Sequence, residues 1–547
     1  MSETRSTASH SAHVDPFARD HLPPRALWPV MDYSLPDLDY PAALNCATEL
    51  LDRIVAERGG DRTAFLFPGG RWSYHELLAS ANRIARVLVE DLGLVPGNRV
   101  LLRGPNNPLM AACWFAVLKA GGIVVCTMPL LRSRELAYII DKARVSLALT
   151  DARFTTELEK AGQATSSLER TVAFGGEPES GTLEALMAAK PHDFENVRTA
   201  ADDVAILAFT SGTTGRAKGT MHFHRDILAV ADTFSQHVLR PRADDVFCGS
   251  PPFAFTYGLG GMLLFPMRIG AASLLLEQAP PPGLLDGIRE HGATICFTAP
   301  TAYRALLDEV GRAGAGSLRA CVSAGETLPA ATFAAWERAT GIRIIDGIGA
   351  TEMLHIFISA AGSDCRPGAT GRDVPGYRSC ILDDGGGEVE DGTVGRLAVR
   401  GPTGCRYLDD EERQRGYVEN GWNVTGDAFV RDEDGYFWYQ ARTDDMIITS
   451  GYNVAGPEIE NVLLEHPSVK ECGVIGVPDP ERGHVIKAVV VLRNGVAASP
   501  ETAKQLQDFV KAEIAPYKYP RLVVFADALP RTETGKLQRY KLREAGA

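Results

Sequence analysis

The sequence predicts an α/β protein with a large N-terminal domain of stacked βαβ units, a β-rich subdomain, and a small α+β domain at the C-terminus. Three observations predict this class. Short apolar strands alternate with amphipathic helices up to about residue 300, turn-rich short strands follow from about Gly371, and a last unit begins near residue 441. At 547 residues the chain is too long for a single hydrophobic core, so we expect several folding units.

The strand and helix alternation is clearest between residues 99 and 150. The apolar run of Arg99–Arg103 predicts a strand, and Gly121-Gly122 ends the helix that follows. The ranges expected after that first strand are a helix at 109–120, a strand at 123–126, a helix at 132–143 and a strand at 147–150. The same rhythm returns at 271–277, 283–291 and 294–298. It implies a largely parallel sheet with helices on both faces.

The last third of the chain has a different pattern. Asp-Gly and Gly-Gly turns at 383–387 and 434–435 separate short strands and predict a β-rich subdomain that ends near Gln440. A strand at 486–492 and a helix at 502–514 follow. We therefore expect an N-terminal extension at 1–25, a large domain at 26–440 and a small domain at 441–547.

Composition excludes several classes of function. The net charge of −13 disfavours a nucleic-acid surface, which needs clustered positive charge. The ten cysteines include no C-x-x-C pair, so zinc and thioredoxin-type sites lack support. The first ten residues are polar and no apolar run is long enough to span a bilayer, so we expect a cytoplasmic protein without membrane or nucleic-acid partners.

The segment Thr210–Gly219 is the strongest functional signal. It follows the apolar run of Val204–Phe209 and combines three glycines, four hydroxyl side chains and Lys218. Glycines let backbone N–H groups approach an anion, while hydroxyls and a lysine add donors and charge. It is not a Walker loop, because Ala217 rather than glycine precedes the lysine. A flexible surface turn is the alternative, but the combination favours a phosphate-binding loop.

Four further segments are weak individually. Glu352, in Asp346–Glu352, suits a Mg²⁺ ion that bridges phosphates, or it is a carboxylate that stabilises a helix start. Asp427 suits a ribose diol or a turn. Lys536 ends a glycine turn and is either functional or one more solvated lysine. Ser323–Glu326 could bring backbone against a flat base.

The order of these segments resembles the acyl- and aryl-adenylating superfamily from about residue 40 to 543. The matching motifs are T-S-G-T-T-G-x-x-K-G, G-x-T-E, T-G-D, Arg442–Met446 with Ser450–Tyr452, and R-T-x-T-G-K ending at Lys536. Segments 250–260, 346–357 and 515–521 resemble the benzoate-CoA ligase branch. The opening His13–Pro24 is similar to the 2-aminobenzoate (anthranilate)-CoA ligases in particular.

The resemblance implies the adenylate-forming enzyme fold and a two-step reaction with ATP, Mg²⁺ and coenzyme A. An acid and ATP give an acyl-adenylate and pyrophosphate, and the thiol of coenzyme A then displaces AMP. Carried over by motif, the residues expected to bind the nucleotide are Thr210, Ser211, Gly212, Thr213, Thr214, Lys218, Gly325, Glu326, Asp346, Gly347, Ile348, Asp427 and Arg442. Thr351 matches the α-phosphate hydroxyl, Glu352 the Mg²⁺ carboxylate and Lys536 the lysine that bridges substrate and α-phosphate.

Two positions bear on movement and on nucleotide affinity. Asp444 matches the hinge about which the mobile C-terminal domain of this family turns between the two steps. Ile348 departs from the tyrosine that usually stacks on adenine, so aromatic stacking is lost there.

The substrate is expected to be a small aromatic carboxylic acid. The pocket residues implied by the resemblance are Phe255, Thr256, Tyr257, Gly258, Ala302, Gly325, Gly349 and His355. Thr256 replaces what looks like alanine in benzoate ligases, and its hydroxyl could accept a hydrogen bond from an ortho-amino group. Core packing is the alternative for Phe255, and a structural role is the alternative for His355.

The sequence therefore predicts an aryl-CoA ligase for 2-aminobenzoate. A benzoate- or salicylate-CoA ligase remains open, as does a stand-alone enzyme that loads an aryl group onto a carrier protein. A homodimer is expected by analogy.

Overall fold

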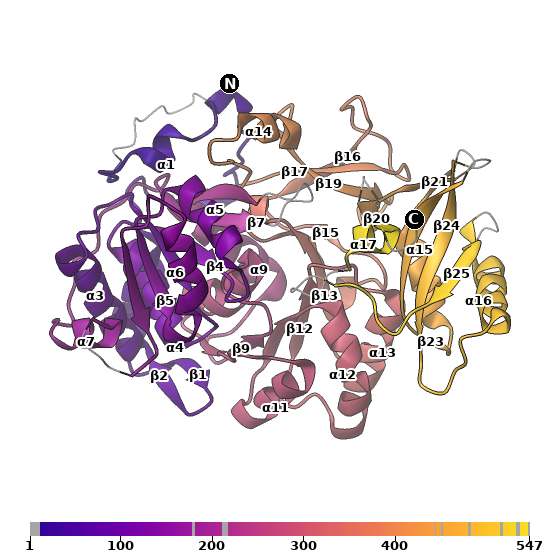
Figure 1. The fold of residues 1–547 in the computed structure, drawn as a ribbon, viewed down its shortest axis with the longest axis horizontal. Helices are drawn as coiled ribbons and strands as arrows, with labels where there is room; N and C mark the ends of the chain where they lie inside the picture. Colours follow the sequence, from indigo (N-terminus) through magenta and orange to yellow (C-terminus); the bar gives the residue numbers. More distant parts are fainter. Residues whose placement is uncertain are drawn as a thin grey trace.

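The computed structural model describes residues 11–177, 181–210, 217–442, 445–449, 452–479, 483–514, 518–531 and 537–544. Two large sheets lie side by side, a third sheet lies above them in Figure 1, and the C-terminal elements lie at one side. Within the described part of the chain, no helix is long and apolar enough to cross a membrane.

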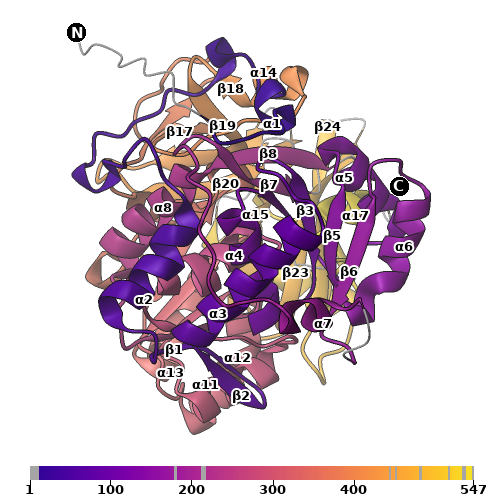
Figure 2. The same ribbon diagram turned by 90° about the vertical axis from the view of Figure 1, so that its left-hand side faces the viewer.

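The first large sheet has six strands in the order β6-β5-β3-β4-β7-β8, and all pairs are parallel except β7 with β8. Its strands are β3 (Arg99–Arg103), β4 (Ile123–Thr127), β5 (Leu147–Asp151), β6 (Arg170–Phe174), β7 (Val204–Thr210) and β8 (Lys218–Phe223). Helices cover both faces, as predicted (Figure 2). The helices of this half are α2 (Arg53–Arg58), α3 (Tyr74–Arg86), α4 (Pro108–Lys119), α5 (Ser133–Ala143), α6 (Thr155–Gln163) and α7 (Leu183–Ala188).

The second large sheet has nine strands in the order β15-β14-β13-β12-β11-β9-β10-β1-β2. Its strands are β1 (Thr63–Phe67), β2 (Gly70–Ser73), β9 (Val246–Gly249), β10 (Ala272–Leu274), β11 (Ile295–Thr298), β12 (Ala320–Ala324), β13 (Ile344–Gly349), β14 (Ile356–Ser359) and β15 (Arg372–Asp373). Its helices are α8 (His224–Val230), α9 (Thr256–Leu259), α10 (Phe265–Ile269), α11 (Pro281–His291), α12 (Pro300–Ala313) and α13 (Ala330–Thr340). The edge strands β2, β14 and β15 pair antiparallel, so the prediction of a parallel sheet holds for the centre and not for the edges.

The predicted strand at 271–277 was too long. The strand that pairs with its neighbours is β10, which covers only Ala272–Leu274, because the chain then leaves the sheet. Glu277 is instead held by Arg153 of the other sheet.

The predicted β-rich subdomain is confirmed as a five-stranded antiparallel sheet. It comprises β16 (Arg378–Leu382), β17 (Gly395–Arg400), β18 (Val418–Glu419), β19 (Trp422–Arg431) and β20 (Phe437–Arg442), with α14 (Glu411–Tyr417) beside it. The C-terminal elements follow: β21 (Ile447–Thr449), β22 (Tyr452–Val454), α15 (Gly456–Glu465), β23 (Val469–Asp479), β24 (Gly483–Leu492), α16 (Pro500–Glu513), β25 (Leu522–Phe525) and α17 (Arg539–Glu544). They enclose their own apolar clusters.

The main core lies between the two large sheets, where α4 is buried along nearly all of its length. The Asn107 side chain accepts a hydrogen bond from the Met110 amide at the start of α4, and Pro108 takes the first helical position, where no N–H is needed. Trp114 and Phe115 of α4 pack edge to face within this core.

The described part of the N-terminal extension packs tightly on the six-stranded sheet and adds the short helix α1 (Phe17–Asp20). The Asp15 carboxylate accepts from the Arg99 guanidinium at 2.5 Å. The guanidinium groups of Arg99 and Arg144 each lie 4.7 Å from the centroid of the Phe17 ring. This segment is thus part of the folded body rather than a loose tail.

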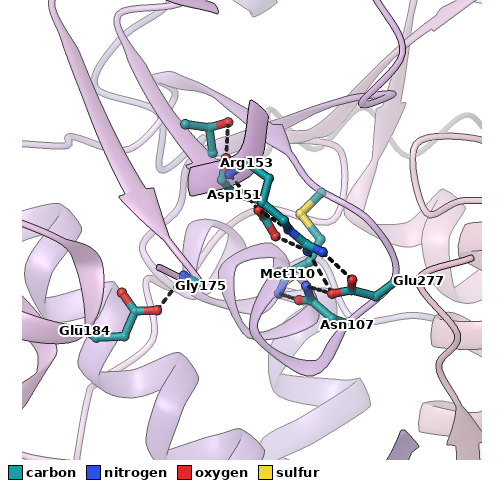
Figure 3. Close-up of polar contacts among 8 residues, drawn as sticks. Asn107, Met110, Asp151, Arg153, Gly175, Glu184 and Glu277 are labelled. Atoms are coloured by element: carbon teal, nitrogen blue, oxygen red, sulfur yellow. Dashed lines mark hydrogen bonds and ion pairs between the residues drawn. The ribbon is translucent and has the colours of Figure 1, made fainter. Parts of the chain in front are cut away.

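A polar junction joins the two large sheets (Figure 3). Arg153 donates to the Asp151 carboxylate at the end of β5 and also to Glu277, which follows β10 of the nine-stranded sheet by three residues. Asn107 donates to the same Glu277 carboxylate at 2.9 Å. Crossovers leave β3 and β5 in opposite directions, which makes this the switch-point crevice of the six-stranded sheet. The ion pairs of Arg153 with Asp151 and Glu277 lie at this crevice.

Candidate active site

The predicted functional residues gather where strands of the nine-stranded sheet end and where the other two sheets approach it. Crossovers leave β9 and β11 in opposite directions, so the switch-point crevice of this sheet lies between their carboxyl ends. Six predicted residues lie outside the described residues: Ser211, Gly212, Thr213, Thr214, Asp444 and Lys536.

The ends of the predicted phosphate loop lie together. Thr210 ends β7, Lys218 begins β8, and the two residues are antiparallel partners across the pair. Sequence analysis did not predict this hairpin-like pairing. It fixes where the chain leaves and re-enters the sheet around residues 211–217.

Glu352 lies in a buried polar cluster with Tyr407. Its side chain belongs to the 3₁₀ turn η8 (Thr351–Met353) and is nearly buried. The Tyr407 hydroxyl donates to Glu352 Oε1 at 2.6 Å. Burial, and next the Glu352 carboxylate, raise the pKa of Tyr407 well above its usual range, so this donor keeps its proton. Lys218 Nζ lies 5.6 Å from the centroid of the Tyr407 ring, which brings the lysine of the predicted phosphate loop to the same cluster.

Thr351 is held from behind by His222 of β8. His222 Nε2 donates to the Thr351 carbonyl at 2.8 Å, and burial lowers the pKa of His222 to about 4. The neutral ring therefore fixes the backbone of η8 and leaves the threonine side chain, which is half-buried, for other contacts.

The residues predicted for the adenine pocket lie on adjacent parallel strands. Gly325 and Glu326 follow β12, while Asp346, Gly347 and Ile348 lie in β13, paired in register with β12. Gly325 has φ of +89°, a conformation that glycine adopts without strain. The Glu326 carboxylate accepts from Arg531 at 3.2 Å, a contact that the sequence did not predict.

The predicted ribose pair lies across two strands. Asp427 of β19 and Arg442 of β20 are directly opposite partners, and Arg442 Nη1 donates to Asp427 Oδ1 at 3.1 Å. After burial, the carboxylates of Glu352 and Asp427 raise the pKa of Tyr417, so both lie within electrostatic range of one phenol.

The predicted acyl pocket begins at the switch-point crevice. Phe255 precedes α9, whose first residues are Thr256, Tyr257 and Gly258. The Tyr257 hydroxyl donates to the Val322 carbonyl of β12 at 2.9 Å, which fixes the ring as a wall. A Cβ on Gly258 would lie 2.3 Å from the Pro252 carbonyl oxygen, so only glycine fits this turn. The remaining predicted residues of this group are Ala302 in α12, Gly349 at the end of β13, and His355.

His355 is buried among aromatic rings. Its ring packs edge to face on Phe265 at 4.6 Å between centroids and lies 5.8 Å from Tyr257. Burial lowers the pKa of His355 to about 3, so the ring is neutral. Among the described residues neither ring nitrogen has a hydrogen-bond partner. A Cβ on Gly260 would lie 2.3 Å from the ring, so this glycine makes room for the histidine.

Sequence reasoning missed Tyr407, Tyr417 and Arg531. The Tyr407 hydroxyl contacts Glu352 across 55 residues, and Arg531 contacts Glu326 across 205 residues. After burial, the Glu352 carboxylate also raises the pKa of Tyr417, 65 residues away in the chain. No local pattern signals such contacts, although the motif that contains Lys536 also contains Arg531.

The chain belongs to the AMP-binding enzyme family. Residues 51–407 match the AMP-binding enzyme family and residues 458–536 match the AMP-binding enzyme C-terminal domain. This agrees with the adenylate-forming fold predicted from the motifs, including a separate C-terminal domain.

Named relatives extend along almost the whole chain. A benzoate-CoA ligase of Thauera aromatica is 34% identical over 516 residues, which cover 93% of this chain and 98% of the relative. A 4-hydroxybenzoate-CoA/benzoate-CoA ligase of Rhodopseudomonas palustris is 34% identical and covers 91% and 94% of the two chains. A solved structure of the anthranilate CoA ligase AuaEII in complex with anthranoyl-AMP has a TM-score of 0.89 at 34% identity and covers 93% of this chain and 99% of its own.

Proposed function

We propose that this chain is an ATP-dependent aryl-CoA ligase that activates 2-aminobenzoate or a closely related benzoate-like acid. In the first step a carboxylate oxygen attacks the α-phosphorus of ATP, and pyrophosphate leaves. In the second step the thiol sulfur of coenzyme A attacks the acyl carbon, loses its proton, and AMP leaves. Full-length similarity to enzymes named as benzoate and anthranilate CoA ligases supports this reaction.

The single observation that carries the substrate class is the aromatic pocket. Tyr257 is fixed by its hydrogen bond to Val322, and neutral His355 is packed among aromatic rings. Rigid walls of this kind at a switch-point crevice favour a flat ring over a flexible acyl chain. The remaining proposed pocket residues are Phe255, Thr256, Gly258, Ala302, Gly325 and Gly349.

The polar cluster supports phosphate binding. We assign Lys218 and the loop 210–214 to the β- and γ-phosphates and Thr351 to the α-phosphate, because η8 and β7 contact each other and Lys218 lies over the Tyr407 ring. Charge develops on phosphoryl oxygens in this reaction, so fixed donors and a cation lower the barrier electrostatically.

Glu352 is the proposed Mg²⁺ ligand. One buried carboxylate fits an ion that takes its other ligands from phosphate oxygens and water. Within the described part of the chain no three His, Cys, Asp or Glu side chains are grouped to hold a metal ion, so the ion would arrive with the nucleotide. When bound, Mg²⁺ supplies neutralisation of phosphate charge; Tyr407 orients the carboxylate.

The remaining assignments follow the same proposal. Asp427 and Arg442 bind the ribose diol, Gly325, Glu326, Asp346, Gly347 and Ile348 form the adenine pocket, Lys536 bridges substrate and α-phosphate, and Asp444 is the hinge. The domain bounds are 26–440 and 441–547 after an extension at 1–25.

The test is a screen that follows pyrophosphate and thioester separately, with ATP, Mg²⁺ and coenzyme A. The acids are benzoate, 2-aminobenzoate, salicylate, 4-substituted benzoates and a medium-chain fatty acid. We expect both products, with the highest kcat/KM for an ortho-amino or unsubstituted ring. A preference for the fatty acid would overturn the substrate class.

Pyrophosphate without thioester would instead favour the alternative of an aryl-adenylating enzyme that loads a carrier protein, which a side-by-side assay with carrier protein would check. A homodimer stays a prediction that light scattering can test.

A further inference from the structure

Four side chains form an alternating chain of charges between the nine-stranded sheet and the C-terminal elements. Arg304 Nη2 lies 4.0 Å from Glu471 Oε1, Glu471 Oε2 accepts from Arg531 Nη2 at 2.9 Å, and Arg531 Nη1 donates to Glu326 Oε1 at 3.2 Å. We call these four residues the interface ion network. Arg304 and Glu326 come from α12 and the end of β12, whereas Glu471 and Arg531 come from β23 and the segment after β25.

The interface ion network is shielded from solvent more than ordinary surface pairs are. The four side chains retain between 16% and 27% of their exposure, and burial lowers the pKa of Arg304. Partly buried charges are screened less by salt, and each central member contacts two opposite charges. Helices α12 and α13 lie beside β23 and α15 in Figure 1, and α13 contacts α15, so the network spans a packed interface.

Arg531 also pairs with Leu537, the described residue that follows the segment containing Lys536. Arg531 and Leu537 form an antiparallel bridge, and the Gln538 amide donates to the Pro530 carbonyl at 2.9 Å. The described residues that flank 532–536 are therefore held together at Arg531, which also belongs to the network. Through Glu326, these flanking residues are tied to the end of β12, next to Gly325 and the predicted adenine pocket.

We infer that Arg531 is a positioning residue for adenylation: its bridge between Glu471 and Glu326 holds the described residues on either side of 532–536 beside the end of β12. The inference rests on the proposed function, in which Lys536 serves the first step. The inference predicts different effects on the two steps of the reaction. Loss of the bridge slows formation of the aryl-adenylate and leaves thioester formation from a supplied aryl-adenylate intact.

The test uses the full chain with Arg531→Met, Glu471→Gln and the control Arg493→Met. Arg493 is an exposed arginine at the end of β24, so the control removes the same charge from the same part of the chain. Adenylation is measured as pyrophosphate–ATP exchange with 2-aminobenzoate. The second step is measured as thioester formed from synthetic aryl-adenylate and coenzyme A.

We expect Arg531→Met to lower adenylation about ten-fold or more and to change the second step less than two-fold. Glu471→Gln is also expected to lower the rate of adenylation. The double variant is expected to lose a smaller factor in this rate than the product of the two single losses, because the residues share one network. Arg531→Lys is expected to recover part of the rate, since it keeps the charge without the two-pronged geometry. Higher salt is expected to slow the wild-type first step more than that of Arg531→Met.

Equal losses in both steps, or an Arg531→Met variant that matches Arg493→Met, would overturn the inference. If Arg531→Met does not fold, as judged by circular dichroism and thermal unfolding, Glu471→Gln decides the question with the same two assays. Failure of the proposed function is distinguishable, because wild-type protein would then lack one or both activities.

Discussion

The hydroxyl of Tyr407 donates a 2.6 Å hydrogen bond to the carboxylate of Glu352, 55 residues earlier in the chain. Short bonds to a charged acceptor are stronger than neutral ones, and this one lies in a nearly buried site. Tyr407 is itself fixed by the antiparallel bridge between its backbone and Thr220 of β8. The geometry of the proposed Mg²⁺ carboxylate thus depends on a segment that the motifs do not include.

Tyr407→Phe is therefore expected to weaken adenylation. The change leaves the Glu352 carboxylate without its donor, which costs about 1.5–3 kcal/mol for a bond to a charged group, or roughly 10- to 100-fold. The half-saturating Mg²⁺ concentration in pyrophosphate–ATP exchange should rise. Tyr417→Phe is a matched control, because the Tyr417 hydroxyl has no hydrogen-bond partner among the described residues. Equal effects of both variants would contradict the role of Tyr407.

Thr256→Ala tests substrate recognition at the first residue of α9. Loss of one modest hydrogen bond should lower kcat/KM for 2-aminobenzoate about ten-fold, with a smaller change for benzoate, which has no ortho donor. Thr256→Ser is expected to retain the preference because it keeps the hydroxyl. Parallel losses on both acids would remove Thr256 from the specificity argument.

Stability should fall steeply in mild acid because three histidines are buried neutral. Burial lowers the pKa to about 4 for His222 and to about 3 for His224 and His355, against 6.5 in the unfolded chain. The unfolded state binds protons first as pH falls through 6.5, so this stability is present above that pH and is lost as pH falls to about 4 for His222 and to about 3 for His224 and His355. At pH 5.5 the three histidines together lower the free energy of unfolding by about 4 kcal/mol relative to its value well above pH 6.5.

Urea midpoints measured between pH 7.5 and 5.0 check this expectation. His224→Asn is the useful comparison, since Asn Oδ1 can replace His224 Nδ1 as the acceptor of the Cys46 amide without titrating. In this variant the urea midpoint should lose about a third of the pH dependence that the three histidines cause. If the urea midpoint of the wild type falls with pH no more steeply than that of the variant, buried His224 is ruled out as a contributor.

Arg153→Met should destabilise the junction between the two large sheets. The Asp151 side chain is 1% exposed and would lose both guanidinium contacts, which costs about 1–3 kcal/mol. Glu277→Gln is the control, because the Glu277 side chain is 37% exposed and its pairing contributes about 1 kcal/mol or less. Calorimetry should show a lower Tm for Arg153→Met than for Glu277→Gln, and the reverse order would contradict the assigned role of Arg153.

The sequence was informative wherever the signal is local. Largely apolar segments of four or five residues predicted β3, β4 and β5 to within one residue, because a buried parallel strand needs continuous apolar side chains. Glycine turns predicted the β-rich subdomain, since positive φ at Gly386 and Gly435 demands that residue type. The prediction of a parallel sheet was wrong at the edges, because nothing in the local sequence distinguishes an antiparallel edge strand such as β14 from a parallel one.

The candidate site divides in the same way. By themselves, the residues determined the family, and they predict the phosphate loop and the Thr351-Glu352 pair, because short ordered motifs carry all three. Only the tertiary structure decided that Tyr407 meets Glu352, that Arg531 meets Glu326 and that His355 is neutral. The physical reason is that hydrogen bonds, ion pairs and desolvation depend on distances between side chains, and chain folding sets those distances across separations at which sequence order carries no signal.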